Sequence, residues 1–96
     1  MDNEIQKIKP KIVKVLKKHN VARAGIFGSY ARGEQTKKSD IDIVIDIKTK
    51  GFSLLDLIGL EMELERILKR KVDLLTYAGI NPYIRKHILD EEIKII

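Results

Sequence analysis

The sequence predicts an α+β fold in which helices pack on a mixed sheet of three or four strands. Segments with apolar residues at every third or fourth position alternate with short β-branched runs, in the order α-β-α-β-α-β-α. Residues 92–96 add a candidate edge strand at the end. Because the chain has 96 residues, no cysteine and no internal repeat, we expect residues 1–96 to form a single domain without disulfides or thiol-bound zinc.

The first half of the chain contains two helical patterns and two strand patterns. An apolar stripe predicts a helix from Asn3 to His19, and Pro10 either begins the main part of this helix or kinks it. Gly33 is a natural stop for a second, much shorter helical segment. The other elements predicted here are a buried strand at 21–27, the short helix at 29–32 and a second strand at 40–47.

Two further helix starts can be recognised in the second half of the chain. Ser53, three residues before Asp56, resembles a capping box, and an apolar helical face follows it. Asn81 and Pro82 are typical of the cap and first turn of a last helix, which we expect to reach Leu89. The strands predicted in this half lie at 71–76 and 92–96.

Charge is distributed unevenly along the chain. Residues 1–38 contain 10 lysines and arginines against 3 acidic residues, whereas residues 39–96 contain 9 against 11. A basic first half attracts nucleotides, nucleic acid or an acidic protein. Since only 5% of the residues are aromatic and no stacking platform is evident, direct binding of nucleic acid is disfavoured. Without a signal-peptide pattern or an apolar run of ~18 residues, the protein is expected to be cytoplasmic and away from membranes.

Gly28 and Ser29 stand where the first predicted strand passes into the short helix. A glycine at this place lets a ligand approach the backbone closely, and the N–H groups at a helix start can hold a phosphate. The serine adds a hydroxyl group. Alone, such a pair is an ordinary turn, and it is not a Walker A loop because no Gly-Lys-Ser/Thr follows.

Asp40 and Asp42 flank Ile41 at the start of the second predicted strand. Alternate side chains of a strand point to the same face, so the two acids share one face, with their Cα atoms about 6.6–6.8 Å apart. The isoleucines between and after them take the opposite face, which is expected to be buried. Two adjacent carboxylates repel unless a cation lies between them, and Mg²⁺ prefers carboxylate and phosphate oxygens. The pattern therefore predicts a two-metal magnesium site; the alternative is a solvent-facing strand surface.

Asp73 is a third candidate because it is an acid within the apolar strand at 71–76. Two interpretations remain open from the residues alone. It could bind a metal and help to activate an attacking hydroxyl group, or it could be a surface residue of an edge strand. Asp46 has the same strand parity as Asp42 but lies about 13 Å from it along the strand. We therefore expect Asp46 to be structural.

The wording Phe-Gly-Ser-Tyr-Ala-Arg-Gly-Glu, followed by Ser-Asp-Ile-Asp-Ile-Val-Ile, resembles the minimal nucleotidyltransferases (MNT). These belong to the polymerase-β-like nucleotidyltransferase superfamily and are antitoxins paired with HEPN-domain toxins. The resemblance implies the polymerase-β-like nucleotidyltransferase fold. It also implies that Gly28 and Ser29 hold the phosphates of ATP, that Asp40 and Asp42 bind Mg²⁺, that Asp73 completes the triad, and that Arg32 supports the phosphate loop.

The function implied by the resemblance is Mg²⁺-dependent transfer of AMP from ATP to a tyrosine hydroxyl of a HEPN toxin. Larger relatives bind the acceptor with a second domain, so here we expect a partner protein to present it, in an assembly of both chains. Two other functions remain open. A non-catalytic nucleotide-binding module would neutralise a partner by occlusion alone, and a small basic RNA-binding protein would use only the charge of the first half.

Overall fold

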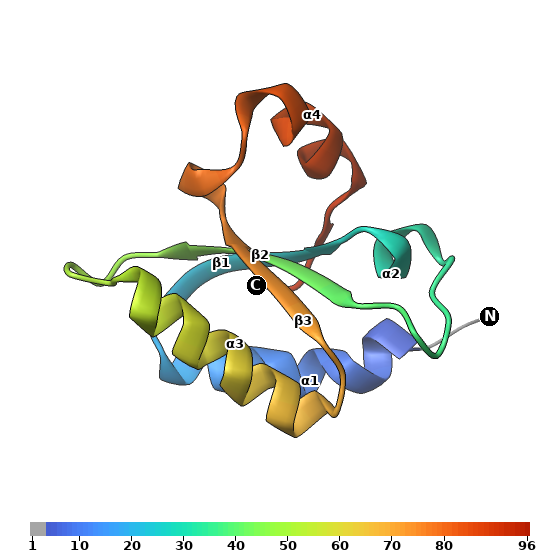
Figure 1. The fold of residues 1–96 in the computed structure, drawn as a ribbon, viewed down its shortest axis with the longest axis horizontal. Helices are drawn as coiled ribbons and strands as arrows, with labels where there is room; N and C mark the ends of the chain where they lie inside the picture. The colour runs from blue at the N-terminus through green and yellow to red at the C-terminus, as the bar shows by residue number, and fades with distance from the viewer. Residues whose placement is uncertain (1–3) are drawn as a thin grey trace.

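The computed structural model describes residues 4–96 and has a four-stranded mixed sheet with helices on both faces (Figure 1). The predicted α+β class is therefore confirmed, with four strands rather than three. Asn3, where the first helix was predicted to begin, lies outside the described residues, as does most of the segment used to judge a signal peptide. None of the helices within residues 4–96 combines the length and apolar character needed to cross a membrane.

Most element boundaries agree with the sequence patterns. The elements are α1 (Glu4–Lys18), β1 (Val21–Phe27), α2 (Ser29–Arg32), β2 (Ile41–Ile47), α3 (Leu54–Leu68), β3 (Val72–Thr76), the 3₁₀ turn η1 (Tyr77–Gly79), α4 (Pro82–Glu91) and β4 (Ile93–Lys94). Helix α1 continues through Pro10 instead of beginning there. Ser53 and Asp56 form the predicted capping box. Helix α4 runs two residues beyond the predicted end at Leu89, and no sequence pattern predicted η1.

The strand order is β3-β2-β1-β4, and it brings three strand ends to one place. Strand β1 is antiparallel to β2, so its last residue, Phe27, pairs with Asp42 near the start of β2. Strand β3 is parallel to β2, and Asp42 pairs with Asp73 near the start of β3. The end of β1 therefore meets the starts of β2 and β3 at one edge of the molecule.

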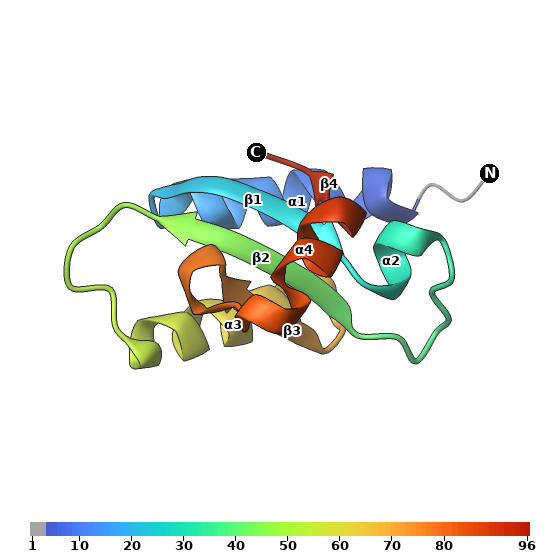
Figure 2. The ribbon, with the colours of Figure 1, turned by 90° about the horizontal axis from the view of Figure 1, so that it is seen from above.

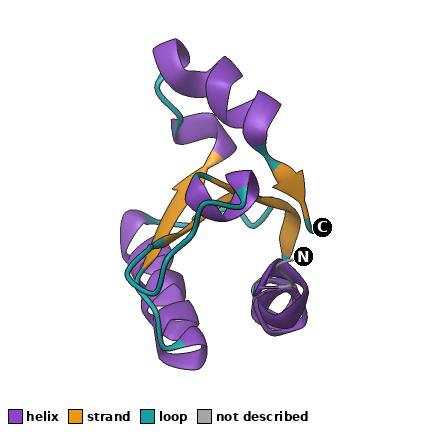
Figure 3. Ribbon diagram, turned by 90° about the vertical axis from the view of Figure 1, so that its right-hand side faces the viewer, coloured by secondary structure: helices purple, strands orange, loops and turns teal. Residues whose placement is uncertain are grey.

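The main hydrophobic core lies between the sheet and helices α1 and α3, which cover one face (Figures 1 and 3). Ile41, Ile43 and Ile45 of β2 are fully buried in it, as the alternation in the sequence predicted. Leu16 of α1 and Leu64 of α3 are also fully buried in this core. This layer fixes which face of β2 carries the aspartates.

A second, smaller apolar cluster covers part of the aspartate face. Val44 is fully buried there against Tyr77 of η1, Ile80 and Ile88 of α4. Helix α4 lies over this face and crosses β2 (Figure 2). The isoleucine face of β2 is buried as expected, and this second cluster buries part of the aspartate face as well. Near the starts of β2 and β3 the aspartate face is more accessible than at Val44: Asp42 is half-buried and Asp73 is exposed, whereas Val44 is fully buried.

Strand β3 is an edge strand whose outward N–H groups are protected by α3. Glu65 accepts a hydrogen bond from Val72 N at 3.0 Å, and Glu61 accepts one from Leu74 N at 2.9 Å. Unpaired strand edges invite pairing with other chains, and charged side chains at the edge prevent this. The two glutamates thus hold β3 in place beside the aspartates of β2.

Candidate functional site

Two glycines with positive φ angles flank the short helix α2. Gly28 caps α2 with φ 74° and ψ −150°, and Gly33 ends the helix with φ 72°. The conformation of Gly28 is almost restricted to glycine. A Cβ atom on Gly28 would also overlap the Asp42 carboxylate, so the backbone of the turn passes directly beside this acid. The two parts of the sequence motif, Gly-Ser and Asp-x-Asp, are thus in contact.

The structure places the three predicted acids at neighbouring strand starts. Asp40 immediately precedes β2, Asp42 is its second residue, and Asp73 is the second residue of β3. Asp42 and Asp73 are register partners in the parallel pair, so their side chains leave the same face side by side. Asp73 is therefore an edge-strand residue and also a neighbour of the aspartate pair, and its role as a metal ligand stays a prediction.

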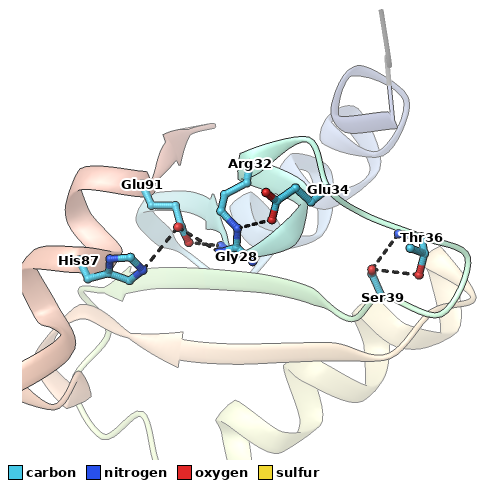
Figure 4. Close-up of polar contacts among 7 residues, drawn as sticks. All are labelled: Gly28, Arg32, Glu34, Thr36, Ser39, His87 and Glu91. Carbon is cyan, nitrogen blue, oxygen red and sulfur yellow. Dashed lines mark hydrogen bonds and ion pairs between the residues drawn. The ribbon is translucent and has the colours of Figure 1, made fainter.

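The connection before Asp40 is fixed by polar contacts at both ends. Ser39 Oγ accepts a hydrogen bond from Thr36 N at 2.8 Å, which closes a turn (Figure 4). Arg70, just before β3, donates to the carbonyl oxygen of Lys37 at 2.8 Å and to that of Thr36 at 3.3 Å. These bonds hold the connection against the start of β3 and set the position of Asp40.

Electrostatics at this place are unfavourable to ionised acids. The pKa of Asp42 is raised from 3.8 to about 6, mainly by burial and then by repulsion from and hydrogen bonding with Asp73 and by the charge of Asp40. The positive charge of Arg32 opposes this shift only in part. A carboxylate with such a raised pKa lacks a compensating cation.

The residues present fit a magnesium site that includes ligands from a substrate. Within residues 4–96, no three His, Asp or Glu side chains converge as a ready-made metal cluster. Mg²⁺ is commonly bound by one or two carboxylates together with substrate phosphates, so a pair such as Asp42 and Asp73 is sufficient on the protein side. The raised pKa of Asp42 is the observation that supports the fit, because the charge of a divalent cation would stabilise the buried carboxylate and offset the repulsion from Asp73 and Asp40.

Asp42→Asn is expected to raise the melting temperature at about pH 8 without Mg²⁺, and to change it little at about pH 4. The folded-state pKa of Asp42 lies above the ordinary value, so the contribution of this group to stability is fully present below about pH 4 and is lost as the pH rises through about 6. Asparagine has no proton to lose. Thermal denaturation of both proteins across this range measures the effect, and a difference that does not grow with pH would contradict it.

A residue that the sequence did not indicate occupies the phosphate turn. Glu91, at the end of α4, accepts a hydrogen bond from Gly28 N at 2.7 Å and pairs with Arg32 Nη1 at 3.0 Å (Figure 4). His87 lies one turn earlier, with Nε2 3.6 Å from the same carboxylate. Burial would raise the pKa of Glu91, but the bonds from Arg32 and Gly28 outweigh it and lower this pKa. The turn therefore binds an anionic group, here supplied by the protein itself.

The neighbouring Glu92 anchors this end of α4 to the sheet. It accepts a hydrogen bond from the Tyr77 hydroxyl group and lies over Gly25, where a Cβ atom would overlap it. Arg23 stacks on the Tyr77 ring, 4.5 Å from its centroid. A Glu-Glu pair at a helix end has no local signature of such contacts. Only the return of α4 over the sheet brings Glu91 to Gly28, which lies 63 residues earlier.

Arg32 lies at the site as predicted, but its contacts are with acids of the protein. It pairs with Glu34 at 2.8 Å and with Glu91, and these bonds raise its pKa. Ser29 is the first residue of α2, beside Gly28, and is half-buried. The structure thus brings together all six predicted residues, and adds Glu91.

Residues 10–96 match the family described as Polymerase beta, Nucleotidyltransferase. The chain is 50% identical over 92 residues to a Methanocaldococcus jannaschii protein named "Putative protein adenylyltransferase MJ0435", a match that covers 96% of this chain and 98% of that protein. It is 40% identical over 75 residues to the protein adenylyltransferase MntA of Thermococcus cleftensis, covering 78% of this chain and 75% of that protein. The family match spans every residue of the site.

Solved structures share the fold. A chain described as a "putative minimal nucleotidyltransferase" superposes with a TM-score of 0.80 at 33% identity, covering 97% of this chain and 95% of that chain. A chain from a toxin–antitoxin complex with AMP-PNP has a TM-score of 0.83 at 23% identity, covering 92% and 72%. A third, from a complex of a tri-AMPylated Shewanella oneidensis HEPN toxin with an MNT antitoxin, has a TM-score of 0.77 at 20% identity, covering 95% and 71%.

Proposed function

Because the chain belongs to the polymerase beta nucleotidyltransferase family, we propose that this nucleotidyltransferase is an antitoxin that transfers AMP from ATP to a HEPN toxin. The acceptor group is a tyrosine hydroxyl, and the reaction depends on Mg²⁺. The observation that carries the proposal is the register that sets Asp42 opposite Asp73 and beside the Gly28 turn. A relative named as a protein adenylyltransferase and neighbours from toxin–antitoxin complexes support the choice of substrate and partner.

In this proposal the phosphate turn binds the triphosphate. Gly28 N–H donates to a carboxylate in the protein alone, so it is oriented toward an anion. Arg32 pairs with the same carboxylate, and a guanidinium group serves equally well for phosphate oxygens. Ser29 adds a hydroxyl group at the same turn. These groups position ATP so that its α-phosphate lies over the aspartates.

Asp40, Asp42 and Asp73 would hold Mg²⁺, which when bound neutralises the negative charge on the reacting phosphate. Asp42 is the central ligand, since it lies between the phosphate turn and Asp73. Asp73 is exposed and stands on the side away from Gly28, where an acceptor can approach it. It is therefore the candidate to receive the proton of the attacking hydroxyl group.

Each transfer exchanges one bond at the α-phosphorus of ATP for another. The acceptor oxygen forms a bond to the phosphorus, and the bond from the phosphorus to the bridging oxygen breaks. Pyrophosphate leaves with that electron pair, and the hydroxyl proton passes to a carboxylate. Attacking and leaving oxygens lie roughly in line, so most of the rate comes from positioning and charge neutralisation.

We extend the proposal to more than one transfer on the same partner. One of the solved structures that share this fold is a complex of a tri-AMPylated HEPN toxin with an MNT antitoxin, which supports this extension. In a later round, a ribose hydroxyl of AMP that is already attached takes the place of the tyrosine hydroxyl. The bonds made and broken at the α-phosphorus are the same.

Intact-mass spectrometry of the chain mixed with a HEPN toxin from the same genome tests the proposal. With ATP and Mg²⁺, we expect the toxin to gain the mass of one or more AMP groups, and mapping by peptide fragmentation should locate the first on a tyrosine. A complex that forms without any mass change would favour neutralisation by occlusion. An unmodified toxin, together with efficient modification of an aminoglycoside or RNA end, would overturn the choice of a protein acceptor.

Glu91→Gln is expected to tighten binding of ATP·Mg²⁺ about tenfold, because the phosphates compete with this carboxylate for Gly28 N–H and Arg32, and a charged hydrogen bond contributes about 1.5–3 kcal/mol. Glutamine keeps the size but lacks the charge. Asp90→Asn, an exposed neighbour on the same helix, is the matched control and should bind as the wild type does. Titration calorimetry measures both. Weaker binding by Glu91→Gln would instead mean that Glu91 holds the turn in its binding conformation.

A further inference from the structure

A basic hollow of about 390 Å³ lies beside Asp40, where β2 and β3 begin. We call it the basic hollow because five cations line it, with Asp40 as the one carboxylate: Lys37, Lys38, Lys69, Arg70 and Lys71. The cations come from two separate segments, the connection before β2 and the connection between α3 and β3. The fold thus gathers one sign of charge next to the aspartates.

Structural roles account for only part of this lining. Arg70 ties the two segments together through carbonyl oxygens. Lys69 and Lys71 follow the C-terminus of α3, where the helix dipole favours cations. Lys37 and Lys38 belong to the other segment, and within residues 4–96 neither of them forms an ion pair. Five cations gathered around a single carboxylate repel one another, so the cluster indicates an anionic ligand.

The basic hollow lies on the opposite side of the aspartates from the phosphate turn. Gly28 stands on the β1 side of Asp42, whereas the Lys71 carbonyl oxygen accepts a hydrogen bond from Ile41 N at 2.9 Å, on the β3 side. Attacking and leaving groups lie on opposite sides of the phosphorus in such transfers. With the triphosphate at Gly28, the acceptor must therefore arrive from the side of the basic hollow.

We infer that the basic hollow binds the phosphate of an acceptor that already carries AMP. This inference rests on the proposed function and deepens it, because it assigns a binding site to the acceptor of the later transfers. A ribose hydroxyl of the attached AMP forms the new bond to the α-phosphorus of ATP, pyrophosphate leaves, and the proton passes to a carboxylate. The phosphodiester of the acceptor would otherwise stand unpaired beside three aspartates, and the lysines offset that repulsion.

The Lys69→Gln/Lys71→Gln double variant separates the first transfer from later ones. Intact-mass spectrometry of the HEPN toxin over time should show a first addition within about twofold of wild type and later additions slowed about tenfold, as expected for loss of charge-assisted phosphate contacts. Lys9→Gln/Lys17→Gln removes the same charge from exposed positions of α1 and is the matched control. Equal slowing of all additions, or of none, would overturn the inference.

Ligand binding by the isolated chain tests the inference without a toxin. The probes are the trinucleotide ApApA, pyrophosphate and ATP·Mg²⁺, each titrated at one ionic strength. We expect the Lys69→Gln/Lys71→Gln variant to bind ApApA and pyrophosphate about tenfold more weakly and ATP·Mg²⁺ unchanged. A matching loss of ATP affinity would assign the basic hollow to the phosphates of ATP instead. If no toxin is modified but ApApA binds as expected, the acceptor protein is wrong while the basic hollow stands.

Discussion

Asp42→Asn is expected to reduce AMP transfer roughly 10³-fold, since a bound metal stabilises the transition state by several kcal/mol and each 1.36 kcal/mol is tenfold in rate. Asp42 is the acid in contact with both halves of the site, the Gly28 turn and Asp73. Asparagine has nearly the same shape, so the strand pairing and the buried isoleucines beside it are retained. The loss should therefore appear in the rate, while the protein remains folded.

Asp46→Asn is the matched control for this variant. Asp46 lies on the same strand and face, is exposed, and should tolerate the change without loss of transfer. Initial rates of AMP incorporation and thermal melting are measured on both proteins. Near-normal transfer by Asp42→Asn would contradict its assignment as a metal ligand. A comparable loss in Asp46→Asn would show instead that the strand as a whole does not tolerate the substitution.

The local elements of this fold could be predicted because each has its own signal in the sequence. Alternation of isoleucine and aspartate determined the two faces of β2, and Gly33 and Ser53 marked the end of one helix and the start of another. The resemblance to minimal nucleotidyltransferases, carried by the same stretch, is confirmed by the family match. The candidate site residues in this stretch could therefore be proposed from the sequence.

Long-range packing could not be predicted in the same way. The parallel pairing of β2 with β3, which sets Asp73 opposite Asp42, depends on the crossover through α3 and has no local signature. The coverage of Val44 by α4 likewise requires the chain to return over the sheet. For Asp73 the residues alone left two interpretations; the register places it on an edge strand beside Asp42, and its role as a metal ligand stays a prediction. Glu91 was missed for the same reason, because its partners precede it by 59 and 63 residues.

Gly28→Ala is expected to lower the affinity for ATP·Mg²⁺ by at least about tenfold, because each strained backbone position costs about 1–3 kcal/mol and the new Cβ atom meets a functional group. Gly28 has a positive φ angle that residues with a side chain rarely adopt, and the added Cβ atom would overlap Asp42 Oδ2. The carboxylate must move or the turn must open. Either response separates the phosphate donor from the acid that it stands beside.

Gly51→Ala distinguishes the overlap from the backbone strain. Gly51 also has a positive φ, of 79°, but no heavy atom lies within 4 Å of the position that its Cβ atom would occupy. Both variants should lose some stability in thermal melts, and only Gly28→Ala should lose nucleotide affinity in titration calorimetry. Unchanged affinity in a folded Gly28→Ala protein would remove the turn from the binding site. Equal loss in both variants would attribute the effect to general destabilisation, and the contact between Gly28 and Asp42 would then have no role in holding ATP.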